Sequence, residues 1–171
     1  MKLKVHSIFE SISGEAGGFS QGTWCTFIRL FGCNLDCVYC DTPHAKGQEL
    51  DLFDPMDLDA IVAQCETKHV LITGGEPLSN DLPGKQDAVL QLIELLLDAC
   101  KKVQIETNGS IYIPATSQPV NWVVDYKCPS SLMADSMPGF ISFSQNMLQL
   151  KEEDCAVHVK WVIADKIDLE F

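Results

Sequence analysis

The succession of apolar segments constrains the fold of this chain more than any other feature of its sequence. Short apolar runs with the character of buried strands alternate with segments that have the apolar spacing of helices. The predicted strands comprise residues 5–9, 26–31, 69–73, 103–106, 120–126 and 156–163, and the predicted helices comprise residues 54–66, 84–101 and 144–151. Strands that alternate with helices favour a parallel sheet with right-handed crossovers. The sequence therefore predicts an α/β fold.

Polar residues follow four of these strands directly. They lie at residues 33–42, 74–76, 106–108 and 125–130. A tight turn alone would explain any one Gly-Gly or Asn-Gly pair, but four such groups are hard to explain as turns. The carboxyl ends of parallel strands meet at one edge, where barrel-like α/β folds build their active sites. We therefore expect one functional site at this edge.

Three closely spaced cysteines stand in the first of these polar groups. Cys33, Cys37 and Cys40 are separated by three and by two residues. Soft sulfur ligands favour zinc, copper(I) or iron–sulfur clusters. Three thiolates suit a four-iron cluster with one open iron, although such clusters more often have four cysteines. A four-ligand zinc site completed by Cys25 or His44 remains the alternative.

A third interpretation of these cysteines is that they are ordinary core residues, because free cysteine is among the most buried residue types. Cys65 and Cys100 fit this interpretation, since both fall on apolar faces of predicted helices. The loop around Cys37 fits it poorly, because Asn34 and Asp36 stand between the sulfur atoms. The loop cysteines are therefore better explained as ligands.

The motif at 33–40 matches the CxxxCxxC signature of the radical S-adenosylmethionine (radical SAM) superfamily, with the aromatic Tyr39 before the last cysteine. The continuation Cys40-Asp41-Thr42 and the earlier segment Ile-Phe-Glu-Ser-Ile-Ser-Gly-Glu at 8–15 resemble the 7-carboxy-7-deazaguanine synthase family. Members of this family are lyases of 7-deazapurine (queuosine-type) biosynthesis. The resemblance covers essentially the whole chain. It implies a partial TIM-like β/α barrel of the radical SAM type, formed as a single domain from residues 1–171.

The resemblance also implies which residues hold the cofactors. Cys33, Cys37 and Cys40 match the ligands of a [4Fe–4S] cluster, and Thr42 matches a magnesium ligand, a role that suits a hydroxyl oxygen. The backbone and glutamate of the family's GGEP motif meet the methionine amino group of S-adenosylmethionine (SAM). The residues implied to bind SAM are Tyr39, Cys40, Asp41, Gly74, Gly75, Glu76, Glu106, Thr107, Asn108, Asp125, Lys127 and Ser130.

The substrate implied by the resemblance is 6-carboxy-5,6,7,8-tetrahydropterin, which undergoes radical ring contraction with loss of ammonia. The cluster and SAM supply this chemistry, so no side chain is expected to act as a catalytic acid or base. The residues implied to bind the pterin are Ile12, Ser13, Gly14, Glu15, Arg29 and Thr73. Ser13 and Ala16 depart from the family's Gln-Gly-Glu-Gly loop, so we expect the hydrogen bonds there to differ.

Arg29 is unusual because it stands among apolar residues of a predicted strand. A structural salt bridge would explain a guanidinium at this position. A clamp on a ligand carboxylate, which suits the forked geometry of arginine, is the functional alternative. The matching arginine of the family holds the substrate.

The charge of the chain limits its partners. Twenty-four acidic residues against twelve lysines and arginines give a formal charge of −12, which disfavours nucleic acids and anionic membranes. Residues 1–2 lead into a strand-like segment, and no apolar run approaches the length of a membrane span. We therefore expect a cytoplasmic protein with free or metal-bound cysteines. An electron donor such as flavodoxin or ferredoxin and a homodimer are also expected.

Two other functional classes remain open from the sequence. A glycyl-radical activase would use the same cluster and SAM, but the loop at Glu15 and the Lys-Cys-Pro-Ser-Ser segment at 127–131 are untypical of it. A zinc-stabilised binding module without enzymatic activity would be recognised by its metal content.

Family members usually continue past the last strand found here. We therefore expect a short homologue, a fragment or a subunit whose substrate pocket another segment completes.

Overall fold

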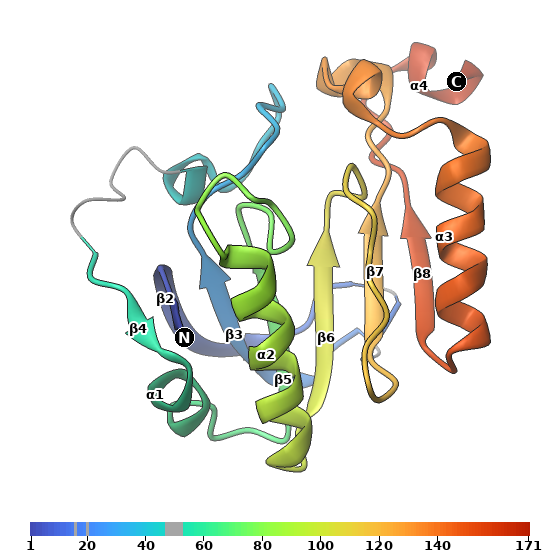
Figure 1. Cartoon of the computed structure of the whole chain (residues 1–171). Helices are drawn as coiled ribbons and strands as arrows, with labels where there is room; N and C mark the ends of the chain where they lie inside the picture. Colours follow the sequence, from blue (N-terminus) through green and yellow to red (C-terminus); the bar gives the residue numbers. More distant parts are fainter. Residues whose placement is uncertain (16, 20, 47–52) are drawn as a thin grey trace.

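A curved six-stranded sheet forms the centre of the computed structural model, which describes residues 1–15, 17–19, 21–46 and 53–171 (Figure 1). Its strands lie in the order β2-β3-β5-β6-β7-β8. They comprise β2 (Val5–Ile12), β3 (Trp24–Leu30), β5 (His69–Gly74), β6 (Lys102–Thr107), β7 (Asn121–Asp125) and β8 (Ala156–Lys160). β2 is antiparallel to β3, and every other neighbouring pair is parallel. The predicted α/β fold with a mainly parallel sheet is confirmed.

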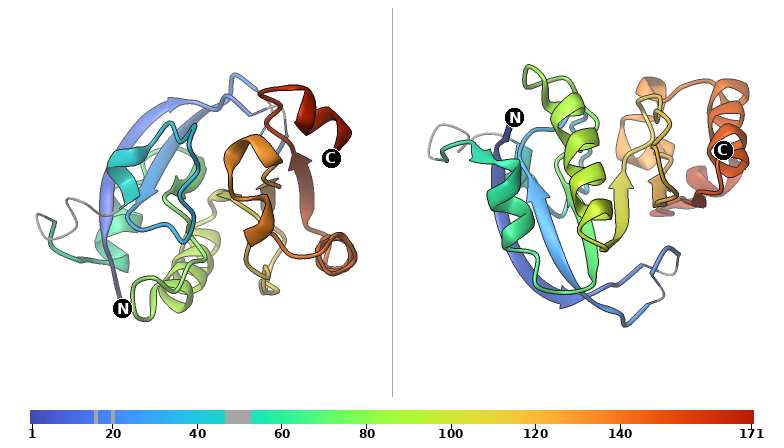
Figure 2. Two further views of the ribbon diagram at one scale, coloured as in Figure 1. Left: turned by 90° about the horizontal axis from the view of Figure 1, so that it is seen from above. Right: turned by 60° about the horizontal axis from the view of Figure 1, so that its bottom comes forward.

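The helices α2 (Lys85–Asp98) and α3 (Phe140–Glu152) cover the same face of the sheet (Figures 1 and 2). The shorter α1 (Leu58–Ala63) packs beside α2, and α4 (Lys166–Glu170) follows β8. Short 3₁₀ helices occur at Pro43–Lys46 (η1), Pro129–Ser131 (η3) and Ala134–Ser136 (η4). No helix in the described part of the chain is long and apolar enough to cross a membrane.

The main hydrophobic core lies between the sheet and these helices. It includes the buried strand residues Ile28, Leu30, Val70, Ile72, Ile105, Trp122 and Val124 and the helix residues Leu92, Ile93 and Leu96. Side chains alternate between the two faces of a strand. Leu71 of β5 therefore lies on the opposite face, in a second small cluster with Phe19 and Cys25. Both faces of the central strands are covered, as expected for parallel strands.

The parallel register brings the carboxyl ends of five strands to one edge of the sheet. The residues at these ends are Leu30, Gly74, Thr107, Asp125 and Lys160. Figure 2 shows this edge from above, with the loop after β3 and the segment after β7 facing each other. Backbone contacts connect the two, because the Val38 amide donates to the Ser131 carbonyl at 3.3 Å. Four predicted polar groups therefore share one edge.

Several details of the sequence prediction are wrong. α1 begins at Leu58 and not at residue 54, because Met56–Asp57 (β4) pairs with Lys2–Leu3 (β1) in a small antiparallel sheet. The last strand ends at Lys160, three residues before its predicted end. Cys100 is exposed and lies beyond the end of α2, so it is not a core residue.

Candidate active site at the carboxyl edge of the sheet

A pocket of about 470 Å³ opens at the carboxyl edge of the sheet, a volume within the usual range of ligand sites. Seventeen of the residues predicted from the sequence line it. They are Gly14, Glu15, Arg29, Cys33, Cys37, Tyr39, Cys40, Asp41, Thr42, Thr73, Gly74, Gly75, Glu106, Thr107, Asn108, Asp125 and Lys127. All three loop cysteines therefore face the same space as the residues that follow β5, β6 and β7.

Gly32 fixes the start of the cysteine loop. Its φ of +88° lies in the left-handed region, which favours glycine. The Gly32 amide donates to the Ala45 carbonyl at 2.8 Å, so the start of the loop is bonded to the 3₁₀ helix at its end. The Gly32 carbonyl accepts from the Glu76 amide at 2.7 Å and from Lys85 Nζ at 2.9 Å. These bonds hold the loop on the Gly-Gly-Glu turn after β5.

The cysteines themselves lie in partly buried positions. Burial raises the pKa of the Cys33 and Cys37 thiols, because it disfavours the charged thiolate. Asn108 Nδ2 lies 3.9 Å from Cys33 Sγ, a weak donor contact to sulfur. The Thr42 hydroxyl lies 3.9 Å from Cys40 Sγ and donates to the Gly74 carbonyl at 3.5 Å.

Gly75 is required by the packing of two loops. A Cβ atom at this position would approach the Gly32 carbonyl carbon and oxygen to less than 3.0 Å, a distance that real Cβ atoms essentially never show. The sequence prediction assigned the glycines of this turn to close approach of a ligand. The structure shows a second reason for a glycine at position 75, because the cysteine loop occupies the space that a Cβ atom would need.

Replacing Gly75 by alanine should therefore destabilise the protein. The added methyl group overlaps backbone atoms that cannot move without breaking the Gly32 hydrogen bonds, so we expect a loss of about 2 kcal/mol or more in the free energy of unfolding. Denaturant unfolding of the apoprotein measures this loss. Gly139→Ala is the control, because a Cβ atom there meets nothing within 4 Å and its φ is −56°. Equal stability of the two variants would contradict the packing role.

Glu76 does not line the pocket, contrary to the predicted contact of its carboxylate with SAM. Its side chain is fully buried below the turn. Its carboxyl accepts from the Leu78 amide at 2.9 Å, the Thr107 hydroxyl at 2.8 Å and the Asn108 amide at 2.6 Å. Burial raises its pKa in spite of these bonds. Glu76 thus joins the turn after β5 to the turn after β6, and the backbone at Gly75 is left to face the pocket.

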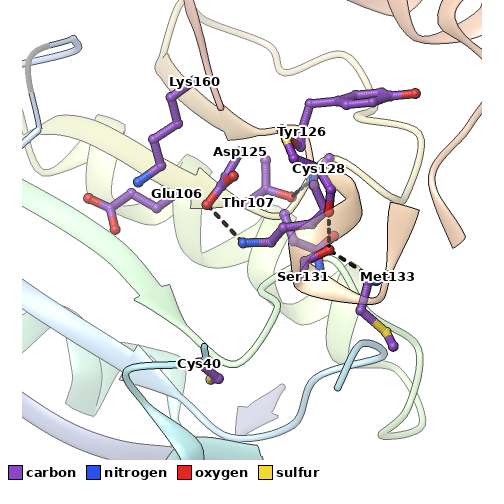
Figure 3. A network of polar contacts seen from close by, with 12 residues as sticks. Cys40, Glu106, Thr107, Asp125, Tyr126, Cys128, Ser131, Met133 and Lys160 are labelled. Carbon is purple, nitrogen blue, oxygen red and sulfur yellow. Dashed lines mark hydrogen bonds and ion pairs between the residues drawn. The ribbon is translucent and has the colours of Figure 1, made fainter. Parts of the chain in front are cut away.

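Glu106 and Lys160 enter the pocket from β6 and β8 (Figure 3). Burial, together with the negative charge of Glu15, raises the pKa of the Glu106 carboxyl. The Thr73 hydroxyl donates to Glu106 Oε2 at 3.0 Å. Lys160 forms an ion pair with Glu15, which joins the loop after β2 to β8 across the pocket. β2 and β8 are the two outer strands of the sheet, so this ion pair links its opposite edges.

Lys160 was missed by the sequence reasoning, as were Lys46, Leu35 and Val162, which also line the pocket. The signal for Lys160 was present, since a lone lysine follows the apolar alternation of the last strand. The predicted strand extended to residue 163, so the lysine was placed inside it and not at its carboxyl end. A strand boundary at Lys160 would have added it to the polar residues of this edge.

Several buried polar atoms on the pocket wall have no hydrogen-bond partner among the described residues. They include Asp125 Oδ1, the Tyr39 hydroxyl and Arg29 Nε. Buried polar atoms are nearly always bonded in folded proteins. Asp125 uses its other oxygen for Lys127 Nζ at 2.8 Å. The free atoms are therefore suited to a polar ligand, and the three soft thiols beside them are suited to an iron–sulfur cluster.

Arg29 has no ion pair among the described residues, so the structural salt bridge that was one interpretation of it is not found there. Its Nη1 lies 3.3 Å from His44 Nε2, and its guanidinium lies over the Phe9 ring at 5.5 Å from the centroid. Both neighbours hold the plane of the guanidinium without neutralising its charge. Arg29 is thus arranged to receive an anionic group.

Besides Glu76, three other predicted site residues do not line the pocket. β2 extends to Ile12, whose side chain is exposed, and Ser13 is buried in the turn that follows, where its amide bonds the Thr23 carbonyl at 2.8 Å. Ser130 instead binds Asp168 near α4, through its amide at 2.9 Å and its hydroxyl at 2.6 Å. Ala16, the other departure from the family's loop, lies outside the described residues.

The Asp168 carboxylate should make stability depend on pH in the acid range. Burial opposes its charge, but hydrogen bonds from Ser130 and from the amides of Ala164 and Asp165 lower its pKa to about 2. An unfolded aspartate titrates near about 3.9. The contribution of Asp168 to folding stability is therefore complete above about pH 4 and is lost as the pH falls towards 2. We expect the melting temperatures of the wild type and Asp168→Asn to converge over this interval, and a constant difference would contradict this assignment.

The geometry of the site gives little support to the zinc-stabilised alternative. Among the described residues, no three His, Cys, Asp or Glu side chains form a group that could hold a single metal ion. Cys25 is fully buried in the second hydrophobic cluster, and His44 is directed to Arg29. Neither residue is therefore placed as the fourth ligand that the zinc interpretation requires.

Comparisons with known proteins identify the family. Residues 27–114 match the model of the radical SAM superfamily. The chain is 36% identical to the 7-carboxy-7-deazaguanine synthase of Methanospirillum hungatei and to that of Clostridium acetobutylicum, with 99% of this chain aligned in both cases. It spans 64% of the length of the first relative and 72% of the second.

The fold is similar to a solved structure described as the crystal structure of QueE from Escherichia coli. The TM-score is 0.59 at 19% sequence identity, and the match covers 99% of this chain and 87% of that chain. Radical SAM proteins use a [4Fe–4S] cluster and SAM, which agrees with three thiols on the wall of one pocket. On these matches, the chain belongs to the 7-carboxy-7-deazaguanine synthase family of the radical SAM superfamily.

Proposed function

We propose that this chain converts 6-carboxy-5,6,7,8-tetrahydropterin into 7-carboxy-7-deazaguanine by radical ring contraction with loss of ammonia. The observation that carries the proposal is the convergence of Cys33, Cys37 and Cys40 with the polar ends of β5, β6, β7 and β8 on one pocket, in a chain of this family. The curved sheet is then the partial barrel of a radical SAM enzyme, with its site at the carboxyl ends of the strands.

The three thiolates would hold a [4Fe–4S] cluster, and the backbone at Gly74 and Gly75 would receive the methionine end of SAM. When both are bound, they supply the radical that abstracts hydrogen from the substrate. The protein then has to bind, orient and shield the reactants. Asp125 and Lys127 form an ion pair on the pocket wall, and Asp125 keeps one oxygen for SAM. Asn108 would serve both cofactors, because its amide is close to Cys33.

The substrate would lie on the side of the pocket where Arg29, Thr73 and Glu15 stand. The Arg29 guanidinium would hold the pterin carboxylate, since it has no anionic partner among the described residues and its forked donors match two carboxylate oxygens. The Thr42 hydroxyl would contribute to a magnesium site whose other ligands are substrate oxygens and waters.

Glu106 and Lys160 would set the electrostatic environment beside the ring. Substrate and product differ by one molecule of ammonia. The nitrogen that leaves must therefore gain protons, and the ring must lose them. Burial and the negative charge of Glu15 raise the pKa of the Glu106 carboxyl, which Thr73 holds on the side of the pocket where the substrate would lie. The Lys160 ammonium would balance the charge of Glu15, its ion-pair partner, and hold Glu15 on the pocket wall.

The test of this proposal is turnover by the anaerobically reconstituted chain. Protein with iron and sulfide restored is incubated with SAM, magnesium, a reductant and the pterin, and 7-carboxy-7-deazaguanine and ammonia are measured together. We expect both products in equal amounts, and neither when SAM is omitted. A fully loaded enzyme that cleaves SAM but leaves the pterin unchanged would contradict the proposed substrate.

We propose two partners for this chain, an electron donor and a second copy of the chain. Reduction of the cluster needs a small one-electron carrier, and we propose flavodoxin or ferredoxin for this role. We also propose a homodimer, because several large apolar side chains are exposed beyond β8. Trp161, Leu169 and Phe171 are examples, with 48%, 72% and 61% of their surfaces exposed. Sedimentation of the reconstituted protein measures the oligomeric state.

A further inference from the structure

Lys85 is a buried lysine below the cysteine loop, and the proposed mechanism does not use it. It is the first residue of α2, and 3% of its surface is exposed. Lysine is almost never so deeply buried unless it is paired. The side chain does not line the pocket, so neither SAM nor substrate would touch it. Its position therefore needs another explanation.

Three acceptors surround the Lys85 ammonium. Its Nζ donates to the Gly32 carbonyl at 2.9 Å, the Ser79 hydroxyl at 2.9 Å and Asp81 Oδ1 at 3.3 Å. An ammonium has three N–H donors and a neutral amine has two, so the three acceptors match the charged form. One of these acceptors belongs to the residue before Cys33. Lys85 thus fixes the backbone at the first cysteine ligand.

Lys85 brings a positive charge to the buried side of the cysteine loop. Burial lowers the pKa of Lys85, while Asp81 and Glu76 raise it. Asp81 is a partly exposed partner with 26% of its side chain accessible, so water screens its charge. The buried Lys85 ammonium, bonded to the carbonyl of the residue before Cys33, is instead placed to stabilise negative charge at this ligand.

We propose that Lys85 is a positioning residue of the cluster site, which holds the Gly32–Cys33 backbone and raises the reduction potential of the cluster. Reduction adds negative charge to the cluster, and a buried cation stabilises that charge. Net charge and hydrogen bonding near the cluster are recognised determinants of its potential. The inference rests on the proposed function insofar as it requires the cluster, but it requires neither the pterin nor turnover.

The experiment compares the cluster reduction potential of the wild type and Lys85→Met by anaerobic redox titration followed by electron paramagnetic resonance. We expect a shift to a more negative potential, with the cysteines still binding the cluster. Lys85→Arg keeps the charge and should keep most of the wild-type potential. An unchanged potential in a cluster-loaded Lys85→Met protein would overturn the proposal.

Lys101→Met is the matched control for loss of a carbonyl-binding lysine. Lys101 Nζ donates to the Thr67 carbonyl at 2.8 Å, at the opposite edge of the sheet. This variant should lose stability in thermal unfolding and leave the potential unchanged. Equal potential shifts in Lys101→Met and Lys85→Met would assign the effect to general loosening of the fold and overturn the electrostatic role.

Asp81→Asn gives an independent result should Lys85→Met fail to fold. Removal of the negative partner leaves the Lys85 charge less compensated, so the potential should shift in the positive direction. A negative or absent shift would overturn the proposal. Wild-type protein that binds no iron and sulfide would instead contradict the proposed function. A wild type that converts the pterin while its Lys85→Met potential is unchanged would contradict this inference alone.

Discussion

Alanine in place of any one of Cys33, Cys37 or Cys40 should abolish both the cluster and the formation of 7-carboxy-7-deazaguanine. The three thiols lie on one loop and line one pocket, so each loss leaves two ligands for four irons. Anaerobic wild-type protein should contain about four iron and four sulfide per chain. Each variant should lose the charge-transfer absorbance, and product should fall below detection.

The control for this experiment is a cysteine outside the pocket. Cys100 is exposed beyond the end of α2, so Cys100→Ala should keep the absorbance and the activity. Cys65 is a second control, because its thiol is buried and donates to the Ile61 carbonyl at 3.3 Å. Burial raises its pKa to about 11, so it is a poor ligand. Stoichiometric zinc without sulfide in protein purified anaerobically from iron-replete cells would contradict the cluster.

Arg29→Ala should reduce conversion of the pterin without reducing cleavage of SAM. The variant loses the guanidinium that we expect to hold the pterin carboxylate, whereas SAM is bound by other residues. Removal of one partner of a desolvated charged pair costs about 2–5 kcal/mol, so pterin conversion should fall by about 30-fold to several thousand-fold. Cleavage of SAM without the pterin should stay close to the wild-type rate. Both rates are measured on cluster-loaded protein.

Arg29→Lys serves as the matched variant, because it keeps the charge but cannot form two parallel hydrogen bonds. We expect its pterin conversion to lie between that of Arg29→Ala and that of the wild type. A folded Arg29→Ala protein that loses both reactions equally would show that Arg29 supports the structure around Phe9 and His44. Such a result would remove Arg29 from the substrate site.

The sequence predicted most of the sheet and the edge at which the pocket lies. Apolar alternation marked the buried strands, and the polar groups at residues 74–76, 106–108 and 125–130 marked their carboxyl ends. These signals are local, since each depends on residues within one strand and its following turn. The three cysteines are a local signal of the same kind.

The features that the sequence did not predict depend on contacts between distant segments. α1 begins late because residues 56–57 pair with residues 2–3, and no local pattern records such a pairing. Glu76 is directed away from the pocket because the backbone amide of Asn108 binds it. Ser130 is bound by Asp168, which follows 38 residues later in the chain. Local patterns located the site, and tertiary contacts decided which side chains enter it.

The most direct measurement of the central claim is an anaerobic crystal structure of the reconstituted protein with SAM and the pterin. We expect the cluster on Cys33, Cys37 and Cys40, SAM along Gly74 and Gly75, and the pterin carboxylate on Arg29. We also expect that Glu76 and Lys85 stay buried and contact neither ligand. A metal held by other residues, or a pterin bound outside the carboxyl edge of the sheet, would contradict the account.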